Sequence, residues 1–191
     1  MLKRVIFLLV FLSFCFRVFS AEKIVMVIAN KDFRDEELLK PLKYFKDEGF
    51  SVDIASNRLE EAQGMLGTKI FPDLTIEEIK VDNYKALVIV GGSGATVLWD
   101  LASLTYKLKE ANQKGKIIGA ICISPITLAK ASLLKGRRAT VWPGESQRLI
   151  DLGVEYVFES VVVDGNIVTA DGPQSALEFA KAIVRLIREK E

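Results

Sequence analysis

The chain of 191 residues contains no histidine. A Ser-His-Asp triad or a Cys-His dyad is therefore excluded, because each needs an imidazole as its general base. Zinc sites built on histidine are excluded for the same reason, and the sequence contains no P-loop. Any acid–base partner of a nucleophile must be a carboxylate, a lysine, a tyrosine or water.

Cysteine is also scarce, since the chain has only Cys15 and Cys122. We expect Cys15 to be removed with an N-terminal leader, which leaves one thiol. One cysteine cannot form an intramolecular disulfide, a C-x-x-C redox pair or a thiolate metal cage. We therefore predict no metal and no cofactor, and a Cys122 that is either buried and inert or kept for its reactivity.

The first 20 residues have the pattern of a cleaved secretory signal peptide. Lys3 and Arg4 precede an apolar run over 5–16, and a small-x-small pattern ends at Ser20. The apolar run spans about 12 residues, whereas a membrane-spanning helix needs roughly 20, so an uncleaved anchor is the weaker alternative. We predict an exported protein, periplasmic or secreted, that meets a membrane only through this leader and keeps residues 21–191 as one domain.

The net charge of the chain argues against a nucleic-acid partner. After residue 20 the chain has 23 basic and 25 acidic residues, a formal net charge of −2, with no arginine-rich segment or basic patch. We therefore predict no nucleic-acid partner.

Strand and helix patterns alternate through the rest of the chain. Apolar runs and alternating β-branched segments predict strands at 23–29, 50–56, 86–90, 116–120 and 138–142, with a hairpin at 161–170 and an irregular or hairpin segment at 64–73. Helical spacing predicts helices over 35–48, 101–114, 145–152 and 176–190, and another directly after Cys122. This alternation predicts an α/β sandwich with a mostly parallel sheet.

Three candidate catalytic or binding segments follow predicted strands: Asn30–Asp35, Gly91–Ala95 and Cys122. Ligands of such folds bind at the carboxyl ends of the strands. We therefore expect these segments to converge on one crevice.

Cys122 lies on a predicted strand-to-helix turn, between the small residues Ala120 and Ser124. Small residues at those two positions relieve the crowding around a nucleophile on a sharp turn. Pro125 suits the first helical turn, and the N-terminus of that helix would lower the pKa of the thiol. The alternative is a cysteine packed as a small apolar side chain.

The segment Gly91–Thr96, GGSGAT, brings glycines to the end of a strand. A dinucleotide fingerprint does not fit, because the register starting at Gly92 finds Val97 where Gly or Ala is needed. We instead predict that backbone amides at Gly91 and Gly92 form a cradle for developing negative charge. The alternative is a glycine turn needed only for tight packing.

The segment DFRDEELLKP opens the first predicted helix, with Asp35 as a plausible N-cap. Acidic residues favour a helix N-terminus in any case. Pro41, however, crowds the carbonyl of the residue four positions earlier, which is Glu37. Pro41 thus strains the helical turn that carries the Glu37 carboxylate, and we predict that Glu37 has a functional role.

Together, the segments FRDEELLKP, GGSGA, AICISP and TADGPQSALEFAKAIVRLI resemble the ThiJ/PfpI superfamily, nearest to the branch of the parkinsonism-associated deglycase. The resemblance extends from Lys23 to the C-terminal helix. It implies a flavodoxin-like three-layer sandwich that is usually a homodimer. It also implies a nucleophilic or oxidisable cysteine at Cys122, a protonated glutamate at Glu37, and oxyanion-hole amides at Gly92 and Ile123.

Two positions depart from the family pattern. The protease-like branch has a histidine directly after the cysteine, where this chain has Ile123, so we expect no protease. The deglycase branch often has a histidine near the pocket where this chain has Trp142, so we expect Trp142 to contact substrate without acid–base assistance.

Two functions fit these residues best. In a glyoxalase or deglycase, Cys122 adds to a small α-oxoaldehyde or its adduct and Glu37 moves the proton. In a non-catalytic, redox-responsive protein, a peroxide oxidises Cys122 to a sulfinate. A holdase chaperone with an inert cysteine is a third possibility. The predicted partners are therefore a small carbonyl compound or a peroxide, and a second copy of the chain.

Overall fold

The computed structural model of the protein describes residues 21–190, so the predicted leader lies outside the described residues. No helix within 21–190 is long and apolar enough to cross a membrane.

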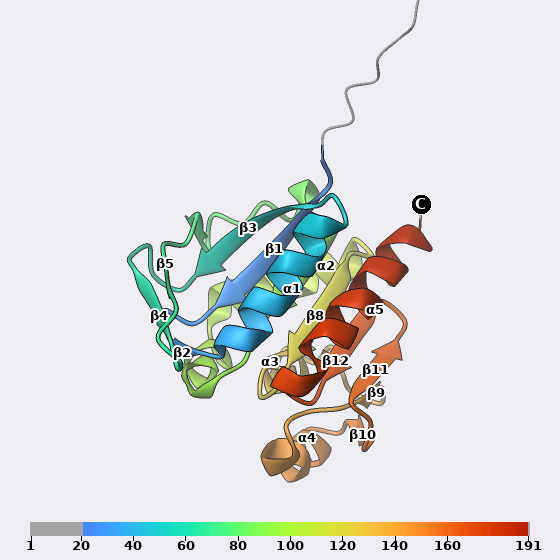
Figure 1. Ribbon diagram of the computed structural model, residues 1–191. Helices are drawn as coiled ribbons and strands as arrows, with labels where there is room; N and C mark the ends of the chain where they lie inside the picture. Colours follow the sequence, from blue (N-terminus) through green and yellow to red (C-terminus); the bar gives the residue numbers. More distant parts are fainter. Residues whose placement is uncertain (1–20, 191) are drawn as a thin grey trace, which may run out of the picture.

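A seven-stranded sheet forms the centre of the molecule, in the order β11-β12-β8-β7-β1-β3-β6 (Figure 1). Neighbouring strands run parallel, except that β11 and β12 form an antiparallel hairpin. The predicted mostly parallel sheet is thus confirmed. Its strands are β1 (Lys23–Ile28), β3 (Ser51–Ser56), β6 (Leu74–Thr75), β7 (Ala86–Ile89), β8 (Ile117–Ile121), β11 (Val161–Asp164) and β12 (Ile167–Ala170).

Helices cover both faces of this sheet, which gives the three layers of a flavodoxin-like fold (Figure 1). Alternate residues of β1 face opposite sides: Met26 packs in the core under α1 and α5, and Val27 packs in the core under α2 and α3. This two-sided burial explains why the sequence of β1 is apolar throughout. The helices are α1 (Asp35–Asp47), α2 (Ala102–Gln113), α3 (Pro125–Lys130), α4 (Ser146–Asp151) and α5 (Ala176–Arg188).

Short elements surround the carboxyl end of the sheet. The segment 64–73, predicted as irregular or hairpin, lies partly in an antiparallel hairpin that begins two residues earlier, and an unpredicted strand extends this hairpin. The three strands are β2 (Lys31–Phe33), β4 (Ala62–Gly64) and β5 (Lys69–Ile70). The strand predicted at 138–142 is shorter than expected, and Trp142 lies beyond it. The part that forms a strand is β9 (Arg138–Ala139), which pairs with β10 (Glu155–Tyr156). The 3-10 segments are η1 (Val81–Asn83), which precedes β7 at the amino end of the sheet, the six-residue η2 (Ser93–Leu98), η3 (Pro143–Glu145) and η4 (Pro173–Ser175).

The start of α1 differs from the prediction, because Arg34 occupies the N-cap position and Asp35 is the first helical residue. The buried carboxylate of Asp35 instead accepts hydrogen bonds from the backbone N–H groups of Leu66 at 2.7 Å and Thr68 at 2.8 Å. These partners lie on the β4–β5 turn, more than 30 residues along the chain. Asp35 therefore fixes this turn to the beginning of α1, beside the site.

Candidate active site

Cys122 lies on the predicted turn between β8 and α3, in a left-handed backbone conformation with φ of +62°. A non-glycine residue rarely adopts this conformation, so surrounding contacts must hold it there. The backbone N–H of Cys122 donates to the carbonyl of Ala170 at 2.9 Å, and its carbonyl accepts from the N–H of Trp142 at 2.8 Å. The turn is thus tied on one side to β12 and on the other to the segment of Trp142.

Ser124 also secures this turn. Its side chain is fully buried, and its hydroxyl donates to the carbonyl of Val90 at 2.9 Å, directly after β7. The small residue predicted to relieve crowding therefore also joins the ends of β7 and β8.

Glu37 approaches Cys122 from α1 and is fully buried. Its Oε2 accepts a hydrogen bond from the N–H of Gly91 at 3.0 Å. Among the described residues, its Oε1 meets no donor at good hydrogen-bond geometry, although the Cys122 thiol is near enough to influence the charge of this carboxyl. Oε1 is therefore the oxygen of Glu37 that is free to hold a proton.

Burial raises the pKa of Glu37 to about 7, because a carboxylate loses its hydration inside the protein. The N–H of Gly91, the Cys122 thiol and the charge of Arg34 lower this pKa in part. Near neutral pH, Glu37 therefore exists in both its protonated and its ionised form. Such a group can both accept and return a proton at that pH.

Burial, followed by the charge of Glu37, raises the pKa of Cys122 to about 12. The backbone N–H groups of Gly92 and Ile123 act in the opposite direction without overcoming these two effects. The predicted lowering of the thiol pKa is therefore wrong beside an ionised Glu37. Helix α3 has only six residues, and its dipole does not compensate for burial next to a carboxylate.

Gly91 and Gly92 allow these groups to come together. A Cβ atom at Gly91 would lie 2.5 Å from the Cβ of Cys122 and 2.6 Å from Oε2 of Glu37. Gly92 has φ of +101°, and a Cβ there would lie 2.4 Å from the backbone nitrogen of Arg34. Both positions therefore require glycine for a close approach of backbone and side chains.

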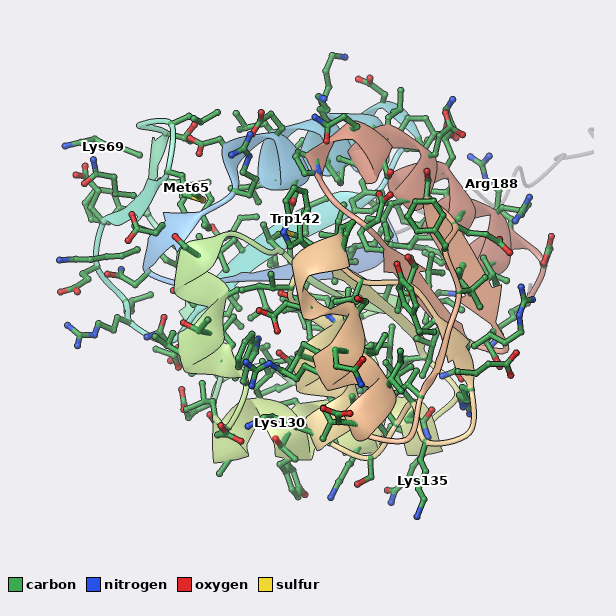
Figure 2. All side chains as sticks on the ribbon, turned by 90° about the horizontal axis from the view of Figure 1, so that it is seen from below. Met65, Lys69, Lys130, Lys135, Trp142 and Arg188 are labelled. Carbon is green, nitrogen blue, oxygen red and sulfur yellow. The ribbon has the colours of Figure 1, made fainter. Side chains whose placement is uncertain are left out.

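A cavity of about 320 Å³ opens above Cys122. Trp142 is 45% exposed at its rim, and Figure 2, seen from below, shows it near the centre of the view with Met65 to its left. The size suits a small molecule. The cavity is lined by Arg34, Glu37, Met65, Gly92, Ser93, Cys122, Ile123, Trp142, Pro173 and Gln174.

The structure thus brings five of the six predicted site residues to this cavity, and the sixth, Gly91, lies directly behind it. Sequence reasoning missed the other lining residues. Arg34 and Gln174 lie inside the segments FRDEELLKP and TADGPQSALEFAKAIVRLI, but nothing in the local sequence indicates that their side chains face the cavity. Met65 comes from a turn whose position depends on the distant contact with Asp35.

No cluster of three metal-ligating side chains (His, Cys, Asp or Glu) occurs in the part of the chain that the structure describes.

The sequence model of the DJ-1/PfpI family matches residues 22–186. The chain belongs to the DJ-1/PfpI family. The predicted resemblance to the ThiJ/PfpI superfamily is thereby confirmed.

Individual relatives agree with this assignment. The chain is 44% identical to an uncharacterised protein of Methanocaldococcus jannaschii, over 87% of this chain and 83% of that one. It is 35% identical to a Pyrococcus furiosus protein named deglycase PfpI, over 87% and 99% of the two chains. The crystal structure of a ThiJ/PfpI domain protein from Brachyspira murdochii superposes with a TM-score of 0.86 at 31% identity, covering 88% of this chain and 98% of that one.

Proposed function

We propose that this member of the DJ-1/PfpI family is a cofactor-independent glyoxalase or deglycase, acting on small α-oxoaldehydes or their adducts. The observation that carries the proposal is the buried carboxyl of Glu37, with a pKa of about 7, beside the thiol of Cys122 at the base of a small cavity. The relative named a deglycase supports the same class of reaction.

The first step is addition of the thiol to the substrate. The sulfur of Cys122 forms a bond to the aldehyde carbon of methylglyoxal, and the carbonyl oxygen takes up the proton that the thiol loses, which gives a hemithioacetal. The N–H groups of Gly92 and Ile123, which already approach the sulfur, stabilise the negative charge that develops on that oxygen. A thiol with a raised pKa makes this step slow unless the proton leaves as the bond forms.

Glu37 carries out the proton transfer that follows. Its carboxylate removes the proton from the aldehyde carbon and returns it to the adjacent carbon through an enediol, so the substrate is isomerised with no net change in electrons. The resulting thioester is hydrolysed by one water to lactate and free Cys122. For an amine adduct of methylglyoxal, one water likewise gives lactate and the free amine.

Lactate formation from methylglyoxal tests this mechanism, with residues 21–191 as the enzyme. Cys122→Ala should abolish turnover, and Glu37→Gln should reduce it by about 10²- to 10⁴-fold, the usual effect of removing a general acid–base residue. Glu178→Gln changes an exposed glutamate on α5 that does not line the cavity; it is the matched control and should retain the wild-type rate. Turnover by Cys122→Ala at the wild-type rate would refute the mechanism.

A second candidate function is favoured by the unpartnered Oε1 of Glu37. A protonated Glu37 could donate a hydrogen bond to an oxygen added to Cys122 by peroxide. Two equivalents of hydrogen peroxide convert the thiol to a sulfinate and release two waters. A mass increase of 32 Da on Cys122 (roughly two oxygen atoms), without lactate formation, would favour this redox-responsive function over the enzyme.

We also propose that the protein is exported after cleavage behind Ser20, as the leader pattern predicts. Expression in a bacterial host should give a mature protein that begins at Ala21 and leaves the cytoplasm. A homodimer is likewise proposed from the family resemblance, and light scattering of residues 21–191 would test it.

A further inference from the structure

Arg34 is the one cationic residue among the described residues that line the cavity above Cys122. It lies at the N-cap position of α1, three residues before Glu37. Its backbone N–H donates to the carbonyl of Gly91 at 2.9 Å, so its main chain is fixed to the glycine segment that supports the site.

The guanidinium is held in place by a neighbouring carboxylate. Nε of Arg34 donates to Oε2 of Glu36 at 2.8 Å, and Nη2 donates to Oε1 at 3.1 Å. Among the described residues, Nη1 makes no further hydrogen bond. The side chains of Arg34 and Glu36 are 28% and 31% exposed, so this two-pronged pair is partly shielded from water.

The electrostatic environment keeps Arg34 charged. The hydrogen bond to Glu36 raises the pKa of Arg34 despite its partial burial, and negative charge on Glu37 or Cys122 acts in the same direction. Once Glu37 is protonated, Arg34 is the remaining charged group that lines the cavity. Glu36 offsets part of this charge but leaves the Nη1 edge of the guanidinium free to donate to an anion in the cavity, with Ser93 and Gln174 as neutral polar neighbours.

We propose that Arg34 makes the cavity select carbonyl compounds that carry a carboxylate over neutral compounds of the same size. As an extension of the proposed function, the preferred substrate class is an α-oxoaldehyde with a carboxylate tail, such as 4,5-dioxopentanoate. The tail would bind the free edge of the guanidinium while the aldehyde carbon meets Cys122. Isomerisation and addition of one water then give 2-hydroxyglutarate.

Alkylation of Cys122 tests the selection without requiring any turnover. Iodoacetate and iodoacetamide are nearly isosteric and differ in charge, and each forms the same S–C bond with release of iodide. The ratio of their rate constants cancels any change in thiol reactivity that a variant causes. Arg34→Gln should lower the iodoacetate-to-iodoacetamide ratio by about tenfold or more, the typical loss of a charged hydrogen bond.

Two further variants test the direction of the effect and its specificity for Arg34. Glu36→Gln removes the anion that now occupies part of the guanidinium and should raise the same ratio severalfold. Arg58→Gln changes an exposed arginine outside the cavity, 67% exposed and paired with Glu60, and should leave the ratio unchanged. If Arg34→Gln fails to fold, Arg34→Lys retains the charge without the fork and should lower the ratio by a smaller factor.

Turnover measurements separate this inference from the proposed function. In the wild type, kcat/KM for 4,5-dioxopentanoate should exceed that for its neutral methyl ester, and Arg34→Gln should reduce the acid-to-ester ratio by about 10- to 100-fold. Absence of turnover with an alkylation ratio that depends on Arg34 would refute the enzyme and support the anion selection. Turnover of both compounds with ratios unaffected by Arg34 and Glu36 would overturn the anion selection and leave the enzyme intact.

Discussion

Glu37 and Cys122 meet across a single glycine, because any side chain at Gly91 would lie within 2.6 Å of both residues. The carboxyl comes from α1 and the thiol from the turn after β8, so the two residues lie 85 positions apart in the sequence (122 − 37). The strand order places β7, which ends just before Gly91, between β1 and β8. A backbone without a side chain is what allows the acid and the nucleophile to influence each other.

Gly91→Ala should therefore separate the pair and destabilise the protein by about 1–3 kcal/mol, the usual cost of overpacking a filled interior. Gly67→Ala is the control for loss of a glycine alone, since a Cβ at Gly67 meets no atom within 4 Å and the change costs only the strain of a positive φ, about 1–3 kcal/mol. Chemical denaturation measures the stability of both variants, and the alkylation rate of Cys122 separates them, because only Gly91→Ala should change it. An alkylation rate unchanged in Gly91→Ala would show that the contacts at Gly91 do not matter.

The pKa of Glu37 predicts how stability depends on pH. The folded-state pKa of about 7 lies above the ordinary value of 4.5, so the native state binds this proton more tightly than the unfolded chain. The resulting stabilisation is complete below pH 4.5 and is lost as the pH rises to about 7. Its size is on the order of 3 kcal/mol.

Glu37→Gln isolates this contribution, because glutamine has a similar shape and no titrating group. The difference in unfolding free energy between wild type and variant should fall between pH 4.5 and 7. Urea denaturation at several pH values measures it. A difference that rises with pH would mean that Glu37 is ionised in the native state throughout this range.

The alkylation rate of Cys122 should report the charge of its neighbour. With a thiol pKa of about 12, the rate with iodoacetamide should still be rising at pH 10. In Glu37→Gln the carboxylate charge is removed, so the pKa should fall and the rate should level off at lower pH. Profiles that coincide for the two proteins would contradict a direct interaction between these residues.

Asp35 should prove important for the shape of the cavity. Asp35→Ala removes the acceptor of two backbone N–H groups and should cost about 1–3 kcal/mol in stability. It should also free the β4–β5 turn, which carries Met65, and raise hydrogen exchange at Leu66 and Thr68. The exposed Asp47, changed to Ala, serves as a control on the same helix. Unchanged exchange at the turn would contradict the anchoring role.

The sequence was sufficient for the fold and for the principal site segments. The apolar run of β1 and its repetition at β7 and β8 determine a sheet buried on both faces, and parallel strands bring their carboxyl ends together. Cys122 was predictable because a nucleophile on a strand-to-helix turn needs small neighbours.

Other features depend on tertiary contacts that local patterns do not encode. The direction of the Cys122 pKa shift follows from burial and from the charge of Glu37, and neither is visible at the level of a helix N-terminus. Asp35 resembled a helix cap, yet its partners lie on a turn far along the chain. The side chain of Arg34 could equally have faced solvent, because the residue at the start of a helix has no fixed inward direction.

The backbone hydrogen bond from the N–H of Cys122 to the carbonyl of Ala170 has a consequence for biosynthesis. Strand β12 and the Pro173–Gln174 segment, which complete the surroundings of the thiol, follow Cys122 by 45 to 52 residues in the chain. A nascent polypeptide therefore carries an unprotected Cys122 until these later residues have been synthesised. We propose that the protein is exported. If it crosses the membrane unfolded, oxidants outside the cytoplasm can react with the thiol before folding places Glu37 beside it, and the rate of folding then sets the fraction of molecules with a reduced Cys122.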